Sequence, residues 1–163
     1  MSVEDNKALV RRYYVYAPSH PDACDEIFAP HFRFHTIQHT AHPDADSSPQ
    51  SEKAAYEWLK AVWGDWRMAI DEMIAEDDRV MVRWTFYGTH RGEYMGLPPT
   101  HRPGTYSGIN IFRIDGGKIA EVWDIYDRLW LWQQLGAIPE TEAFIAQARA
   151  ALSSQPAAGE APR

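Results

Sequence analysis

Two long apolar segments in the second half of the chain, residues 105–114 and 118–127, constrain the fold more than any other feature. They flank Asp115-Gly116-Gly117, which is typical of a β-hairpin turn. Both segments carry large apolar residues at odd and at even positions, so both faces of the hairpin are apolar. An antiparallel sheet normally leaves one face to water. We therefore expect helices to cover one face of this sheet and a second copy of the chain to cover the other.

The remaining segments predict helices first and strands second. Apolar residues at helical spacing predict a helix that ends near Ala17 and another that begins after Ser48-Pro49. The other predicted elements are a short helix at 22–28, strands at 32–37, 68–76 and 80–90, and helices at 130–134 and 139–152. Residues 38–48 and 91–104 predict loops, and the sequence does not decide whether 38–48 closes as a lid. This order predicts an α+β fold with helices packed on a curved, mainly antiparallel sheet.

Composition limits the classes of partner. The 163 residues predict one domain over 1–152 and a disordered tail over 153–163. The chain has a net charge of −7, so it lacks the excess of basic residues that is typical of a nucleic-acid binder. The same charge disfavours binding to an anionic membrane. No apolar run is long enough for a membrane span, and the acidic start does not resemble a signal peptide, so we expect a cytoplasmic protein. The single cysteine, Cys24, excludes an intrachain disulfide.

Asn110 and Asp124 form the most informative pair in the predicted hairpin. A three-residue connection at 115–117 would place them on the same face, one diagonal step apart. The other members of that face include Tyr106, Phe112 and Tyr126. Burial among aromatic rings raises the pKa of a carboxyl group toward values suited to proton transfer near neutrality. The alternative is that Asp124 forms an ion pair with Arg128, four residues further on.

Histidine and arginine residues offer further candidates. His31, His35, His39 and His42 are spaced by three or four residues, but no cysteine pair or His-Glu-x-x-His motif accompanies them, so we expect no metal site. We expect His35 to point into the interior as a hydrogen-bonding residue. Arg83 either neutralises an acidic substrate or pairs with a neighbouring glutamate.

A series of motifs resembles the SnoaL-like polyketide cyclase family over about residues 5–136. The motifs are Phe32-Arg33-Phe34-His35, Gly88-Thr89-His90-Arg91-Gly92, Gly96-Leu97-Pro98-Pro99-Thr100, Ser107-Gly108-Ile109-Asn110-Ile111-Phe112-Arg113-Ile114, Gly117-Lys118-Ile119, Trp123-Asp124, Asp127-Arg128-Leu129 and Gln134-Leu135-Gly136. The resemblance implies a nuclear transport factor 2-like fold, which is a cone-shaped α+β barrel around a deep pocket and is usually dimeric. It also implies that Asp124 is the acid/base of an intramolecular aldol cyclisation without a metal or organic cofactor. The chain departs from the family where Asn110 replaces a histidine and Ile125-Tyr126 replaces Trp-Pro.

These expectations combine into a cofactor-independent cyclase or isomerase-type enzyme that acts on an apolar, carbonyl-bearing small molecule. Asp124 would move the proton, with Asn110 and His35 as hydrogen-bond partners. The expected substrate-binding residues are Tyr14, Trp63, Arg83, Tyr106, Phe112 and Tyr126. One alternative is a hydrolase of the epoxide hydrolase type, which Arg83 facing Asp124 would favour. The other is a non-catalytic binding protein, which an Asp124–Arg128 ion pair would favour.

Overall fold

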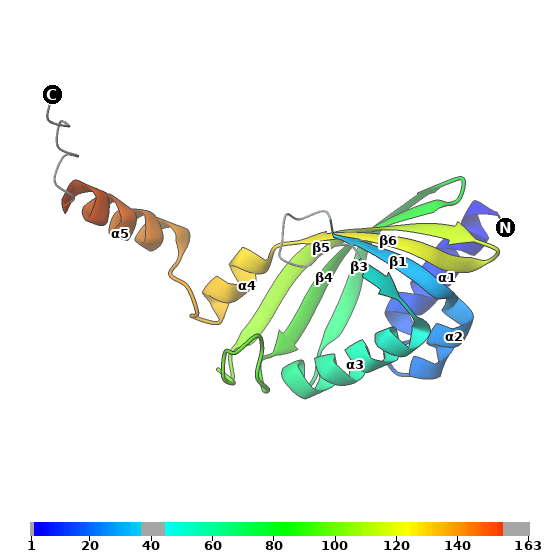
Figure 1. Ribbon diagram of the computed structural model, residues 1–163, viewed down its shortest axis with the longest axis horizontal. Helices are drawn as coiled ribbons and strands as arrows, with labels where there is room; N and C mark the ends of the chain where they lie inside the picture. The colour runs from blue at the N-terminus through cyan, green and yellow to red at the C-terminus, as the bar shows by residue number, and fades with distance from the viewer. Residues whose placement is uncertain (1, 37–44, 155–163) are drawn as a thin grey trace, which may run out of the picture.

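A six-stranded sheet with helices packed on one face forms the body of the protein (Figure 1). The computed structural model describes residues 2–36 and 45–154. The strands are β1 (Phe28–Thr36), β2 (Ala45–Ser47), β3 (Arg67–Glu76), β4 (Arg79–Thr89), β5 (Pro103–Asp115) and β6 (Lys118–Tyr126). The helices are α1 (Val3–Val15), α2 (Cys24–Ile27), α3 (Pro49–Trp63), α4 (Arg128–Gln134) and α5 (Thr141–Ser154). The predicted α+β fold is confirmed.

The strand order is β2-β1-β6-β5-β4-β3, and the sheet is not closed, because β2 and β3 form its two edges. Among the described strands only the β1–β6 pair is parallel, so the sheet is mainly antiparallel as expected. The predicted loop at 38–48 is wrong at its end, since 45–47 forms β2 against β1. Ser48 caps α3, and residues 38–44 of the predicted loop lie outside the described residues.

Serine residues start the two long N-terminal helices. The Ser2 hydroxyl accepts a hydrogen bond from the Asp5 backbone N–H at 3.2 Å, and the Ser48 hydroxyl accepts one from Ser51 at 3.3 Å. Both helices carry a reciprocal capping box, which satisfies N–H groups that a helix start leaves unpaired. Pro49 then occupies the first turn of α3, as its position after Ser48 predicts.

The hairpin of β5 and β6 has a different turn and strand register from those that the sequence predicts. The turn is the two-residue Gly116-Gly117, and both glycines have positive φ. A two-residue turn alone would put Asn110 and Asp124 on opposite faces. Ala120 is an extra residue in β6, because Ile114 pairs with Ile119 and Arg113 with Glu121. This β-bulge shifts the register by one residue, and Asn110 lies directly opposite Asp124 rather than on a diagonal.

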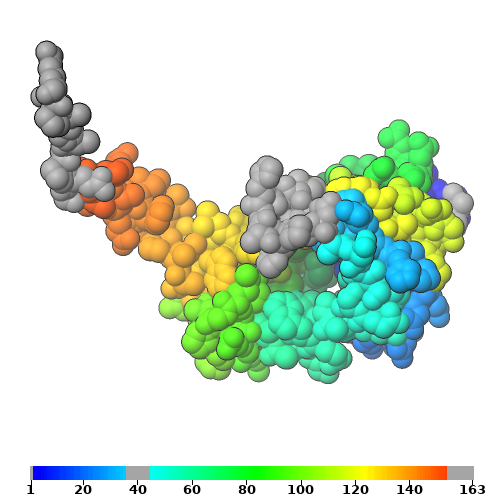
Figure 2. Space-filling model, in the orientation of Figure 1, coloured from blue at the N-terminus to red at the C-terminus, as the bar shows by residue number. Residues whose placement is uncertain are grey.

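The core lies between the inner face of the sheet and helices α1 to α3. Its buried side chains include Val10, Ile27, Phe28, Trp63, Val82, Phe86, Phe112 and Ile119. Helix α5 extends away from the sheet, and its first residue, Thr141, accepts a hydrogen bond from Gln133 of α4 (Figure 2). No helix within residues 2–36 and 45–154 combines the length and apolar character that crossing a membrane requires.

Candidate active site

Asn110 is held firmly on the inner face of β5. Its side chain is only 9% exposed. The Tyr14 hydroxyl, from α1, donates a hydrogen bond to Asn110 Oδ1 at 2.6 Å, and Asn110 Nδ2 donates to the Trp123 carbonyl at 3.4 Å. These contacts fix the amide beside Asp124, its cross-strand partner. The sequence prediction that Asn110 and Asp124 share one face is therefore confirmed.

The Asp124 carboxyl group has no hydrogen bond or ion pair within the described part of the chain. Burial raises its pKa to about 6, and the positive charge of Arg128 opposes that shift. Arg128 lies beyond ion-pair distance and donates instead to the Tyr126 hydroxyl. The expected alternative of an Asp124–Arg128 ion pair is therefore not found. A carboxyl group with this pKa can accept and return a proton near neutral pH.

Aromatic rings form the surroundings of this pair. The rings of Tyr14 and Phe112 lie 6.0 Å apart, and those of Tyr106 and Tyr126 lie 5.7 Å apart. Trp84 from β4 packs edge-on against Tyr106 at 5.7 Å. Three of the expected substrate-binding residues, Tyr106, Phe112 and Tyr126, thus lie on the same inner face as Asp124, and Tyr14 reaches Asn110 on that face from α1. The arrangement suits a flat apolar ligand that presents an acidic C–H bond to one carboxylate.

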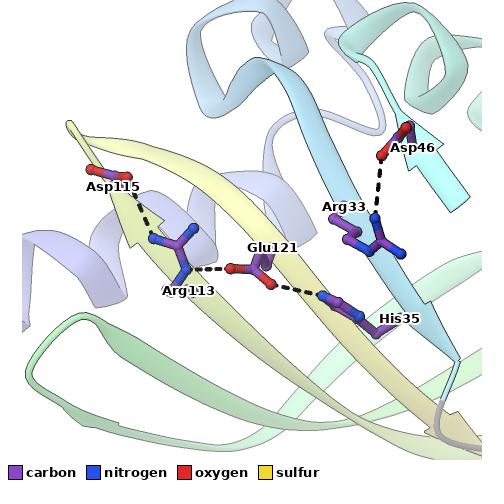
Figure 3. Close-up of polar contacts among 6 residues, drawn as sticks. All are labelled: Arg33, His35, Asp46, Arg113, Asp115 and Glu121. Carbon is purple, nitrogen blue, oxygen red and sulfur yellow. Dashed lines mark hydrogen bonds and ion pairs between the residues drawn. The ribbon is translucent and has the colours of Figure 1, made fainter. Parts of the chain in front are cut away.

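His35 does not lie with Asp124. Strand side chains alternate between faces, and Phe34 and Thr36 pair with Val122 and Asp124 while His35 pairs with Trp123. The His35 ring stacks on Trp123 at 4.5 Å, and its Nε2 lies 2.7 Å from Glu121 Oε2 (Figure 3). The expectation that His35 points into the interior is wrong. On the outer face it shares the Glu121 carboxylate with Arg113, whose Nε lies 2.6 Å from Glu121 Oε1.

Arg83 also lies on the outer face of the sheet. Its guanidinium group contacts Asp71 at 3.2 Å and Glu72 at 3.5 Å. The expected role of Arg83 in binding an acidic substrate is wrong, and the alternative of pairing with a neighbouring acid is confirmed. A hydrolase site formed by Arg83 and Asp124 is excluded, because Trp84, the next residue, occupies the inner face in place of Arg83.

Trp63 is a core residue rather than a wall of a cavity. Its side chain is 1% exposed and packs against Phe86 at 5.4 Å, His90 at 5.3 Å and Tyr94 at 5.5 Å, measured between ring centroids. A side chain covered on every side in this way has no free surface for a ligand. The expected contact of Trp63 with substrate is therefore not supported by its position.

Glu52 is a site residue that the sequence analysis missed. It lines a cavity between α1 and α3, together with Tyr13, Tyr14, Pro18, Ala55, Tyr56, Leu59 and Met68. The Tyr13 hydroxyl donates to Glu52 Oε2 at 3.2 Å, and burial raises the pKa of Glu52 to about 7. The sequence holds a signal for it, since Glu52 precedes Tyr56 and Leu59 by four and seven residues. A carboxyl group on the apolar side of a helix costs folding free energy, so its presence there indicates a functional role.

Glu52→Gln is expected to stabilise the protein at alkaline pH. The unfolded chain releases the Glu52 proton near pH 4.5, whereas the folded chain holds it to about pH 7, so stability falls as the pH rises through this interval. The neutral amide removes that loss. We expect it to raise the free energy of unfolding by about 1–3 kcal/mol at pH 8.5 and to change it very little at pH 4.5. Urea unfolding at both pH values measures the difference. An equal effect at pH 4.5 would show that ionisation of Glu52 is not its cause.

The sequence and the fold of the chain are similar to those of known proteins. The family model for SnoaL-like polyketide cyclases matches residues 7–135, and the chain belongs to this family. Aklanonic acid methyl ester cyclase DnrD of Streptomyces peucetius is 33% identical over 90 residues, which cover 54% of this chain and 61% of that protein. The chain thus matches somewhat less than two thirds of the length of this curated relative.

Two solved structures support the same fold. IdmH of Streptomyces antibioticus, a candidate polyketide cyclase, is 26% identical with a TM-score of 0.68, over 80% of this chain and 98% of that one. AclR of Streptomyces galilaeus, a candidate hydroxylase, has a TM-score of 0.73 at 24% identity over 94% of both chains. At this level of identity the second similarity establishes the fold alone.

Proposed function

We propose that the protein is a cofactor-independent cyclase that closes a ring within an apolar, carbonyl-bearing polyketide ester by acid/base catalysis. The observation that supports this most is the half-buried carboxyl group of Asp124, which has no ion-pair partner among the described residues, lies beside Asn110 among aromatic rings and has a pKa raised to about 6. Family membership and the relative named as an aklanonic acid methyl ester cyclase support the reaction class.

The chemistry needs one base and no resident cofactor. Asp124 takes a proton from a carbon that neighbouring carbonyl groups already acidify, and the C–H electron pair becomes an enolate. The enolate attacks another carbonyl carbon of the same molecule, which forms the C–C bond and places the negative charge on that carbonyl oxygen. Asp124 returns its proton to this oxygen, so the product is an isomer of the substrate. The second N–H of Asn110 is available to bind the enolate oxygen.

Aklanonic acid methyl ester is the first substrate to test. Incubation with the purified chain is expected to give a product of unchanged mass and altered chromatographic retention. Aldol closure rearranges bonds within one molecule and conserves its mass, whereas hydrolysis of the methyl ester would release methanol and leave an acid lighter than the ester by one CH₂ group. Failure to convert this ester and a panel of related polyketide esters would contradict the proposal.

We also propose that a second copy of the chain covers the outer face of β5 and β6. Ile109 and Ile125 pair across the strands there and are 36% and 41% exposed. Polar groups of both signs surround this apolar centre, including the Arg83–Asp71 and Arg113–Glu121 pairs. An apolar centre with a rim of both charges can be self-complementary about a two-fold axis.

Ile125→Glu tests this interface. Sedimentation velocity at about 10 µM is expected to show a wild-type dimer and a folded variant monomer, because two carboxylates would meet near the two-fold axis. Ile74→Glu is the matched control, since Ile74 is also exposed, at 54%, but lies on the edge strand β3. A wild-type monomer at this concentration would contradict the proposal.

A further inference from the structure

The cavity between α1 and α3 contains a second carboxyl group that the proposed reaction does not use. Its volume of about 50 Å³ exceeds the space for one water molecule, so it admits a small polar group. Tyr14 connects the cavity to the active site, because its ring lines the cavity and its hydroxyl donates to Asn110. The negative charges of Asp124 and Glu52 both raise the pKa of the Tyr14 hydroxyl, so Tyr14 lies near both carboxyl groups.

The groups that face Glu52 favour its neutral form. Tyr13 and Tyr14 face it from α1, Cys24 from α2 and Tyr56 from its own helix. None of these side chains carries a positive charge. The neighbouring Lys53 is turned away and pairs with Asp22 and Asp25 at 3.0 and 2.7 Å. Without a cation, desolvation dominates and the carboxyl group keeps its proton to about pH 7.

A neutral carboxyl group is both a donor and an acceptor of hydrogen bonds, whereas an ionised one only accepts. Glu52 Oε2 already accepts from the Tyr13 hydroxyl. The acid O–H is therefore the group that Glu52 offers to a ligand in the cavity. Its natural counterpart is an oxygen that only accepts, such as the carbonyl oxygen of a ketone, quinone or ester.

We infer that Glu52 is a specificity-determining residue that binds a carbonyl oxygen of the substrate remote from the carbon that Asp124 deprotonates. This inference rests on the proposed function, since it places both contacts on one ligand that extends along Tyr14. The substrate class is thereby narrowed to flat apolar molecules with a neutral carbonyl acceptor at the end opposite the reacting carbon. Ionised Glu52 rejects both that carbonyl and a free carboxylate in its place.

Binding of 9-fluorenone tests the inference without any need for turnover, because this ketone has no titratable group. Its dissociation constant, measured by quenching of tryptophan fluorescence, is expected to rise about 30-fold between pH 5.5 and 8.5, as ionisation of a group with a pKa near 7 removes the donor. Fluorene, which has the same ring system without the carbonyl oxygen, is expected to change less than about threefold.

Two variants assign the titrating group. In Glu52→Gln, whose amide donates at every pH, the 9-fluorenone dissociation constant is expected to stay flat and within about threefold of the wild-type value at pH 5.5. In Asp124→Asn the full pH dependence is expected to remain. Absence of 9-fluorenone binding, a wild-type change below about threefold, or unchanged pH dependence in Glu52→Gln would overturn the inference.

The same data separate this inference from the proposed function. If no polyketide ester is cyclised but 9-fluorenone binding follows Glu52, the proposed reaction fails and the binding role of Glu52 stands. If esters are cyclised but the pH dependence of 9-fluorenone binding is unchanged in Glu52→Gln, the proposed reaction stands and the binding role of Glu52 is wrong.

Discussion

Asp124→Asn is expected to lower turnover of a cyclisable polyketide ester by roughly 10²–10⁴ while the protein stays folded. The amide preserves the shape of the side chain but cannot accept the proton of a carbon acid. Steady-state kinetics measures the loss, which should appear in kcat more than in KM, because the hydrophobic surroundings that bind the substrate are unchanged.

Asp127→Asn is the matched control for this variant. It removes one negative charge three residues away, and the asparagine can still accept the helix-capping hydrogen bond that Trp130 N–H donates to Asp127 Oδ1. Its activity is expected to stay within about twofold of the wild type. Retained turnover in Asp124→Asn would remove Asp124 from the mechanism.

Asp124→Asn should also make the protein more stable above neutral pH. The unfolded chain loses the Asp124 proton near pH 3.8, whereas burial holds that proton in the folded chain to about pH 6. Above pH 6 the ionised carboxylate therefore opposes folding, and the amide relieves this by about 1–2 kcal/mol. A rise in stability together with a loss of activity is expected for a group whose desolvation destabilises the fold but is needed for the reaction.

Trp63→Ala is expected to cost about 3–5 kcal/mol of unfolding free energy, the largest stability effect that we predict for a single side chain. Trp63 fills the space between Phe86, His90 and Tyr94 and is 1% exposed, so its removal opens a large cavity in the core. Urea denaturation measures the loss, and Trp63→Phe is expected to recover more than half of it.

Trp58 supplies the control on the same helix. It is 46% exposed, so Trp58→Ala is expected to cost less than about 1 kcal/mol. If Trp63→Ala kept nearly full stability but raised KM, Trp63 would be a substrate-binding residue, as the sequence alone had suggested, and its assignment to the core would be wrong.

The sequence predicts the order and type of most elements because these depend on local signals. The Ser48-Pro49 start of α3 and the turn at Gly116-Gly117 both appear in the structure. Helical spacing predicts the buried side of α3 less well: it groups Trp58 with Val62 and Trp63, yet Trp58 is 46% exposed. Helical spacing indicates a direction around the axis and does not show where the neighbouring elements end.

The position of the candidate site was harder to predict than its residues. Asn110 and Asp124 share a face through a two-residue turn and a bulge at Ala120, whereas we expected a three-residue connection and no bulge. Both routes give the same face, because each shifts the register by one residue. No sequence pattern marks the bulge.

The position of His35 was predicted wrongly, because a shift of one residue along a strand moves a side chain to the other face of the sheet. His35 pairs with Trp123 in the β1–β6 register, so its side chain lies on the outer face against Glu121. Glu52 was not predicted as a site residue, because its surroundings include Tyr13 and Tyr14 of another helix. Contacts between elements far apart in sequence cannot be obtained from spacing along one of them.

The pKa of Asp124 in the free protein is the most direct test of the account. A carbon-13 NMR titration of the carboxyl groups, with Asp124→Asn to assign the signal, is expected to give a value near 6, well above the ordinary value of 3.8. That result would describe a desolvated carboxyl group ready to exchange a proton with a carbon acid. A value at or below 3.8 would describe a solvated or ion-paired carboxylate and would contradict acid/base catalysis by Asp124.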